Sequence, residues 1–284
     1  MAAAKTLNDA YESLQNEANN PDNGEFGVPI IGTAAAKTFQ FDLHGETEKI
    51  PVKFYDYPGG WLDSGRKAEY QHVIDIVKES RVVMVVISMP YLLAENGRFE
   101  SEAHIGWIQD VLQKAVANSK QRKLILIVPT KCEAWINDEK RLFSVLEEKC
   151  ASILNMANGP CGDRLAIAAV PVQTVGNVSF SYFNKEGYGR LFGEVYMKNT
   201  DKKFAPQNVD QPLRYAMCFM LNMLYEEKSG NIFTRLWYRK LRKQLTSFMT
   251  QCHSGLRREG SKIYANDRWI VGTPDTSTVW REDL

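Results

Sequence analysis

Several features that commonly assign a protein to a class are scarce in this chain of 284 residues. Its five cysteines are scattered and form no C-x-x-C pair, so neither a zinc site nor a disulfide framework is indicated. Scattered cysteines of this kind usually serve as small apolar side chains in proteins of the reducing cytoplasm. No apolar run is long enough to cross a bilayer, and the N-terminal residues 1–5 carry no signal-peptide segment. We therefore expect a cytoplasmic protein.

The net charge is also small, at +1, but it is unevenly distributed. Between residues 228 and 262 there are nine Lys or Arg residues and one acid, a net charge of +8, which leaves −7 for the remainder. Such a segment is typical of a helix that contacts an anionic membrane or a nucleic acid. The alternative is a helix that docks on the protein and keeps a solvated basic face.

The apolar pattern predicts strands that alternate with helices. Two continuous apolar runs, 81–88 (RVVMVVIS) and 123–128 (KLILIV), suit strands that are buried on both faces. Further strands are expected at 38–43, 52–55 and 164–174, and helices at 5–18, 65–79, 100–118, 138–156, 211–227 and 231–252. This order favours an α/β fold of three layers, with a mostly parallel sheet and helices on both faces.

The same pattern predicts three regions along the chain. Residues 1–228 form an α/β domain with a loop-rich insert at 176–210. Residues 229–260 form a basic amphipathic helical extension, and residues 261–284 an irregular tail.

The turn after the strand at 52–55 carries the most informative motif, Asp56-Tyr-Pro-Gly59. A carboxylate at the end of a strand can hold a metal-bound water, and a glycine three residues later can offer its backbone N–H to a phosphate. Asp and Pro-Gly-Gly are also ordinary turn residues, so a simple turn is the alternative.

Other polar turns are expected at the same edge of the sheet, where open α/β sheets bind ligands. Gly32-Thr33 precedes the strand at 38–43, and Thr130-Lys131-Cys132-Glu133 follows the strand at 123–128. A further polar turn, 174–177, follows the last strand of the predicted domain.

In this order, the motifs resemble those of a Ras-like P-loop GTPase domain over roughly residues 25–225. More narrowly, they are similar to bacterial double-GTPases of the translation-factor-related (TRAFAC) class. The resemblance implies GTP or GDP and Mg²⁺ as ligands, and a protein partner. It implies that Thr33 and Asp56 serve the magnesium ion, Thr33 through its hydroxyl and Asp56 through a bound water, and that Gly59 contacts the γ-phosphate.

The resemblance also implies a base-reading turn at Thr130, Lys131 and Glu133. The stem of the lysine would pack along the purine plane, and the carboxylate would accept hydrogen bonds from guanine N1 and N2. Glutamate stands where the family commonly has aspartate, so its alternative role is that of a surface acid at the start of a helix.

The chain departs from the family pattern in lacking the phosphate-binding loop G-x-x-x-x-G-K-[ST]. Lys37-Thr38 enters a strand, and Lys5-Thr6 precedes a helix without a glycine before it. Lys5-Thr6 is compatible with the remnant of a phosphate loop in a chain that starts late, in which case we expect a guanine-nucleotide switch protein that hydrolyses GTP. The alternatives are a pseudo-GTPase that acts as an interaction module, or an adaptor that binds membrane or nucleic acid through residues 228–262. Because Gly60-Trp61 replaces the glutamine that orients water in fast relatives, no catalytic residue is assigned.

Overall fold

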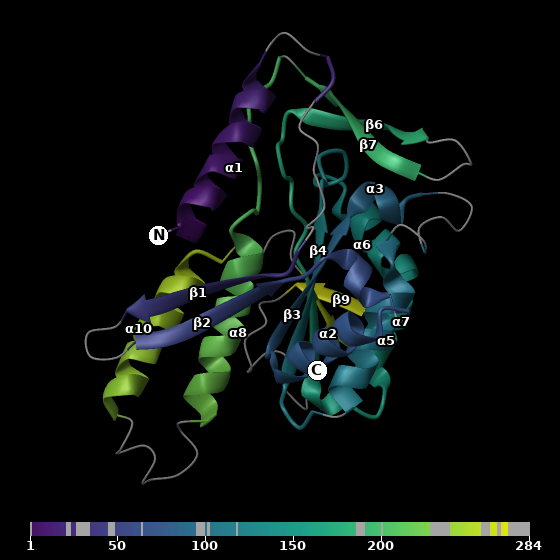
Figure 1. Ribbon diagram of the computed structural model, residues 1–284. Helices are drawn as coiled ribbons and strands as arrows, with labels where there is room; N and C mark the ends of the chain where they lie inside the picture. Colours follow the sequence, from purple (N-terminus) through teal and green to yellow (C-terminus); the bar gives the residue numbers. More distant parts are fainter. Residues whose placement is uncertain are drawn as a thin grey trace.

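A five-stranded mixed sheet forms the centre of the fold in the computed structural model (Figure 1). The structure describes residues 2–20, 24–26, 35–44, 49–63, 65–94, 100, 103–117, 119–185, 191–199, 201–227, 239–256, 262–265 and 268–271. Along the sheet the order is β3-β4-β5-β8-β9, with bounds Val82–Ser88, Lys123–Thr130, Leu165–Ala169, Lys262–Ala265 and Arg268–Val271. The first three strands are parallel, whereas β8 and β9 add antiparallel pairings.

Helices cover both faces of this sheet because its strands are apolar on both sides. Along β4, Ile125 and Ile127 point to one core, and Leu124 and Leu126 point to the other. The first core is covered by α2, α5, α6 and the short α7, with bounds Lys67–Glu79, Ile105–Ala117, Glu139–Lys149 and Ala151–Leu154. The second is covered by α8 (Gln211–Glu227), and α10 (Arg239–Ser254) packs on α8 (Figure 1). Short helical turns complete the connections: η1 Gly59–Leu62, α3 Met89–Leu92, η2 Asn155–Asn158 and η3 Gly162–Arg164.

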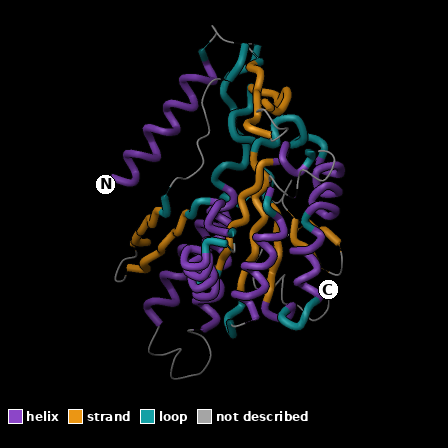
Figure 2. The backbone as a smooth tube through the Cα atoms, turned by 45° about the vertical axis from the view of Figure 1, so that its right-hand side comes forward, coloured by secondary structure: helices purple, strands orange, loops and turns teal. Residues whose placement is uncertain are grey.

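Two antiparallel hairpins lie outside the central sheet. The first joins β1 (Lys37–His44) to β2 (Lys49–Asp56), and Leu43 and Ile50 pack it against the cluster formed by α8 and α10. The second joins β6 (Val178–Lys185) to β7 (Leu191–Lys198). Figure 2 shows the two hairpins at well-separated places around the sheet.

Helix α1 (Ala2–Asn19) projects from the body of the molecule and is fixed at its C-terminal end (Figure 1). Lys198 on β7, whose side chain is 1% exposed, donates from Nζ to the carbonyl oxygens of Glu17 (3.1 Å) and Asn20 (3.0 Å). Ala18 is buried beside Val175 and Tyr196. The position of α1 is therefore set by the β6–β7 hairpin.

The observed elements confirm the α/β class and refine two of the predictions. The sheet is parallel at β3, β4 and β5, as expected, but β8 and β9 make it mixed. These two strands lie in 261–284, where an irregular tail was predicted, and the β6–β7 hairpin lies in the predicted loop-rich insert. Strands β8 and β9 have four residues each, which is too short for a strong period-two signal. Strand β6 (VSFSYFNK) does alternate between apolar and polar residues from 178 to 182, so its pattern is compatible with a strand. Of the predicted basic helix, residues 231–238 lie outside the described part of the chain, and α10 accounts for the rest.

Candidate functional site

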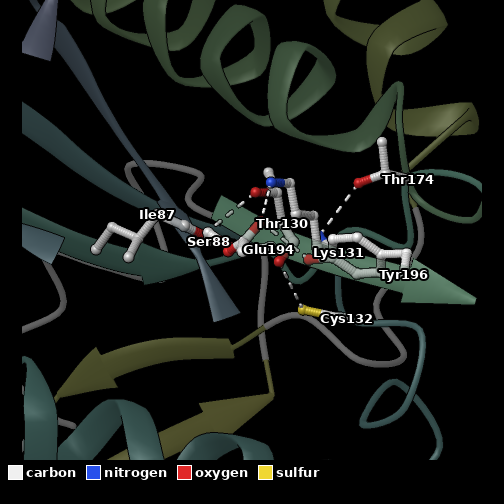
Figure 3. Close-up of polar contacts among 8 residues, drawn as sticks. All are labelled: Ile87, Ser88, Thr130, Lys131, Cys132, Thr174, Glu194 and Tyr196. Atoms are coloured by element: carbon white, nitrogen blue, oxygen red, sulfur yellow. Dashed lines mark hydrogen bonds and ion pairs between the residues drawn. The ribbon is translucent and has the colours of Figure 1, made fainter. Parts of the chain in front are cut away.

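The turn after β4 is held in one conformation by its neighbours. Lys131 has a φ of 58°, and its backbone N–H donates to Thr174 Oγ1 at 3.1 Å. The next amide, that of Cys132, donates to the carbonyl oxygen of Val172 at 3.1 Å. Thr130 turns its hydroxyl to the carbonyl oxygen of Ile87 on β3, at 3.3 Å (Figure 3). The turn after β4 is thus tied to both neighbouring strand ends.

Glu133 links this turn to the one that follows β5. Its Oε1 accepts hydrogen bonds from the backbone amides of Thr174 (2.8 Å) and Val175 (2.9 Å). Its Oε2 is buried and, within the described residues, has no hydrogen-bond partner. A buried acceptor without a donor carries a desolvation cost of about 1–3 kcal/mol. The carboxylate therefore has one oxygen satisfied by the protein and one left to accept a donor.

Lys131 and Glu194 form an ion pair above the ends of the strands (Figure 3). Their side chains are 16% and 3% exposed. Glu194 also accepts hydrogen bonds from Ser88 Oγ, at the end of β3, and from the hydroxyl of Tyr196 at 3.0 Å. Lys131 Nζ lies 5.6 Å from the centroid of the Tyr196 ring. Burial, reinforced by the negative charge of Glu194 and then that of Glu133, raises the pKa of Tyr196 above its usual value.

We call this group the strand-end cluster; it comprises Ser88, Thr130, Lys131, Glu133, Thr174, Glu194 and Tyr196. Three of the predicted site residues belong to it, namely Thr130, Lys131 and Glu133. The central sheet brings them together because β3, β4 and β5 are parallel and end at the same edge.

The other predicted residues lie elsewhere. Asp56 is exposed at the end of β2 and pairs in register with Lys37 of β1, so it belongs to the β1–β2 hairpin. Gly59 begins η1, and a side chain added there would meet nothing within 4 Å. Thr33, with Gly32, lies outside the described residues. The structure therefore describes the predicted base-reading turn and part of the predicted metal site.

An aromatic group follows Asp56. The Tyr57 ring stacks on Tyr55 with a centroid distance of 6.3 Å and contacts Trp61 at 5.7 Å and His72 at 6.0 Å. Trp61 packs against the core under α2. Burial, and secondarily Tyr55, raises the pKa of Tyr57. These contacts fix the Asp56–Gly59 turn against the body of the protein.

Sequence reasoning did not find Glu194, Tyr196 or Ser88. Glu194 lies 63 residues from Lys131 and 106 residues from Ser88 in the sequence, so local spacing gives no indication of their contact. One weak signal is present, because Glu194 is the single acid in an otherwise apolar or aromatic run from 191 to 197. Such a charge on a strand that packs inward needs a partner.

Comparison with protein-family models, with curated proteins and with solved structures finds no match to this chain.

The described residues include no helix that is long and apolar enough to cross a membrane. Within the same residues, no three His, Cys, Asp or Glu side chains gather as a set of metal ligands. A magnesium ion of the kind implied by the resemblance is held mainly by water, phosphate and one or two side chains, so it does not require such a set.

Glu133 and Lys131 are the described residues that would meet the base of a guanine nucleotide of the kind implied by the resemblance. The unpartnered Oε2 of Glu133 is an acceptor for a donor such as guanine N1–H, and Lys131 lies two residues away in the same turn. Of the residues that the resemblance assigns to Mg²⁺ and the terminal phosphate, Asp56 is exposed, and Gly59 has open space where a Cβ would stand.

Proposed function

We propose that this chain is a degenerate relative of Ras-like GTPases and acts as an interaction module that responds weakly to guanine nucleotides. The observation that carries the proposal is the carboxylate of Glu133, which bridges the turns after β4 and β5 and keeps one buried oxygen without a donor. A structural acid would be expected to satisfy both oxygens. In the proposal, Oε2 accepts from the guanine edge, while the Lys131 stem packs on the purine.

The order of the elements supports this ancestry. A two-stranded hairpin is followed by α2, β3, α5, β4, α6, β5 and α8, with the sheet enclosed between the two groups of helices. In this reading Asp56 and Thr33 would serve Mg²⁺, and Gly59 would face the terminal phosphate. A bound Mg²⁺ would supply neutralisation of phosphate charge.

The edge of β3 gives separate support. Its sequence, VVMVVIS, suits a strand with neighbours on both sides, yet within the described residues β3 pairs with β4 alone. Val86 on this strand is 63% exposed. An apolar open edge of this kind is unusual, because exposed edges invite pairing with other chains. A Ras-like sheet that lacks its first strand would have an open apolar edge at this position.

Isothermal titration with GTP and Mg²⁺ tests the proposal. We expect no binding tighter than high micromolar, because charge-assisted bonds from a phosphate loop supply much of the affinity in such proteins. The weak affinities for GDP and ADP are then compared in competition experiments, with the nucleotides at millimolar concentration. We expect GDP to be preferred in the wild type and the preference to vanish in Glu133→Gln, but not in the matched exposed control Glu147→Gln on α6.

Two outcomes would contradict the proposal. Binding at about 1 µM or tighter with steady release of phosphate would make the chain an active GTPase, since this corresponds to about −8 kcal/mol of binding free energy. If the protein shows no preference for GDP over ADP at any concentration, guanine nucleotide is not its ligand.

A second function, binding of nucleic acid through α10, is favoured by the way this helix docks. Leu245 is fully buried against Leu221 of α8, and Phe248 and Met249 pack on the same cluster. The apolar face is thus occupied and is not free to enter a lipid bilayer. Arg239 and Lys243 are exposed in the first turns of a helix that contains no acidic residue. A basic face without an available apolar face suits an electrostatic contact with phosphates.

This second function is tested with a fluorescent duplex DNA at several salt concentrations. Glutamine at Arg239, Lys240, Arg242 and Lys243 together is expected to abolish binding and its salt dependence. The paired control replaces the exposed Lys202 and Lys203 with glutamine. Binding to anionic vesicles without binding to DNA would contradict the nucleic-acid assignment and favour the membrane.

A further inference from the structure

The β6–β7 hairpin lies across the ends of the central strands (Figure 1). Of the described contacts that hold it there, two together involve both of its strands. One is polar, between Glu194 of β7 and the side chains of Lys131 and Ser88. The other is aromatic, between Phe183 of β6 and Tyr91 of α3, whose rings stack with a centroid distance of 5.4 Å. The hairpin therefore covers the turn that follows β4.

Glu194 is the centre of the polar contact (Figure 3). Its side chain is 3% exposed and receives hydrogen bonds from Ser88, Lys131 and Tyr196. A carboxylate with so little access to water is stable only when charged and polar donors surround it. Ser88 and Lys131 belong to the central sheet, so this anion joins the hairpin to the sheet.

The same contact occupies Lys131, one of the two side chains proposed to meet the nucleotide base. Lys131 Nζ is paired with Glu194, and its ammonium lies beside the ring of Tyr196. Glu133 Oε2 is buried, and the charge of Glu133 is close enough to Tyr196 to influence it. Tyr196 stands two residues from Glu194 on β7, so moving the hairpin would release Lys131 from both side chains.

We propose that the β6–β7 hairpin is an autoinhibitory cap, and that Glu194 is the internal anion that holds it over the base-reading turn at Thr130, Lys131 and Glu133. The identity of the excluded ligand, a guanine nucleotide, rests on the proposed function. The hold of Glu194 on the hairpin rests on the contacts alone.

Helix α1 moves with the cap in this arrangement. The backbone amide of Phe26 donates to the carbonyl oxygen of Tyr196 at 2.8 Å, and that of Lys198 donates to Gly24 at 2.8 Å. These bonds join β7 to residues 24–26, and the Lys198 side chain joins the same strand to the end of α1. A partner that pulls on α1 would therefore act on the strand that carries Glu194.

The test combines two measurements on the whole chain. Hydrogen exchange followed by mass spectrometry reports how often β6 and β7 open, and titration with GDP and Mg²⁺ reports access to the base-reading turn. Glu194→Gln keeps the size of the side chain and removes its charge. Relative to the wild type, we expect this variant to exchange at least tenfold faster in the hairpin and to bind GDP at least tenfold more tightly. Asp201→Asn, an exposed carboxylate just beyond β7, is the matched control and should change neither.

Two further variants separate the parts of the proposal. Phe183→Ala removes the aromatic contact without altering charge, so it should shift both readings in the same direction even if Glu194→Gln folds poorly. Lys131→Met should also speed exchange in the hairpin, since it removes the other half of the ion pair. It should not tighten GDP binding, because the lysine itself contacts the base.

The outcomes distinguish the cap from the proposed function. Unchanged exchange in Glu194→Gln overturns the cap. So does wild-type GDP binding that Glu194→Gln and Phe183→Ala fail to tighten, and in that case the proposed function stands. Faster exchange with no GDP binding in any variant supports the hold of Glu194 on the hairpin and overturns guanine nucleotide as the ligand.

Discussion

The ammonium nitrogen of Lys123 lies 2.6 Å from the carbonyl oxygen of Ser80, just beyond the end of α2. The same nitrogen donates to two more backbone carbonyls, those of Val77 (3.1 Å) and Lys78 (2.6 Å). The lysine side chain is fully buried at the start of β4. It therefore satisfies carbonyl groups that have no partner within the helix, and it places a positive charge at the negative end of the helix dipole.

Replacing Lys123 with methionine should destabilise the protein strongly. The change keeps the length of the side chain but leaves carbonyl groups at the end of α2 without donors, at a cost of about 2–4 kcal/mol in total. Urea unfolding followed by circular dichroism measures this. Lys120→Met, at an exposed position three residues earlier, should stay within about 0.5 kcal/mol of the wild type. Equal stability of the two variants would show that the bonds of Lys123 contribute nothing.

Two glycines at predicted or observed turns should differ strongly in how far replacement by alanine destabilises the protein. Gly176 has a φ of 91°, and a Cβ there would lie 2.2 Å from the carbonyl oxygen of Ala205. Gly176→Ala should cost about 2 kcal/mol or more, because both the left-handed backbone and the close approach oppose a side chain. Gly59→Ala should change the unfolding free energy by less than about 0.5 kcal/mol, since the space around it is open. Thermal denaturation of the pair provides the comparison.

The buried cysteines should resist alkylation in the folded protein. Burial raises the pKa of the Cys132 and Cys150 thiols to about 12 in each case. At pH 8 about one such thiol in ten thousand is ionised, and the thiolate is the reactive form. Cys161 is only half-buried.

Peptide mapping after brief treatment with iodoacetamide at pH 8 should therefore find Cys161 labelled ahead of Cys132 and Cys150. The same treatment in denaturant, where all thiols are exposed, is the control. Early labelling of Cys132 in the native protein would mean that the turn after β4 opens readily.

The carboxylate of Asp210, next to the start of α8, should give a pH-dependent contribution to stability. Arg214 Nε donates to its Oδ2 at 2.6 Å and holds the pKa of Asp210 below its usual value. A carboxylate with a lowered pKa in the folded state stabilises the protein above its ordinary pKa of about 3.9, and loses that effect as the pH falls through its folded value.

Asp210→Asn should accordingly lower the free energy of unfolding near pH 6, by about 1 kcal/mol or less for so exposed a pair. The difference from the wild type should shrink as the pH falls below 4. Unfolding curves of both proteins at a series of pH values measure this, with Asp201→Asn as an exposed-carboxylate control. If the difference in unfolding free energy between the two proteins grows as the pH falls, the carboxylate of Asp210 does not stabilise the folded state in the way predicted.

The central layers of the fold were predictable because their residues carry strong, local signals. The runs at β3 and β4 have continuous β-branched and aliphatic side chains, and α8 begins and ends at the predicted residues. Strands β8 and β9 were missed because each has four residues, too few for alternation to be informative. The pairing of β8 with β5 joins parts of the chain that are almost 100 residues apart, which no local pattern encodes.

The candidate site was predicted in part for the same reason. The Thr130–Glu133 turn follows a strong strand, so its place at the edge of the sheet could be inferred. The partner of Lys131 could not, since Glu194 lies 63 residues further along the chain, on a hairpin whose contact with the turn no local pattern encodes. The function of the predicted residues remains a prediction that nucleotide titration will test.

The attachment of α1 has a consequence for how the chain is made. Lys198 reaches back 181 residues to the carbonyl of Glu17, so α1 is synthesised well before the strand that holds it. At about 5–20 residues per second, that delay is about 10 to 40 s. A single helix of 18 residues is only marginally stable in water over such a time. Helix α1 is therefore synthesised long before β7, and it lacks its Lys198 anchor until that strand has been made.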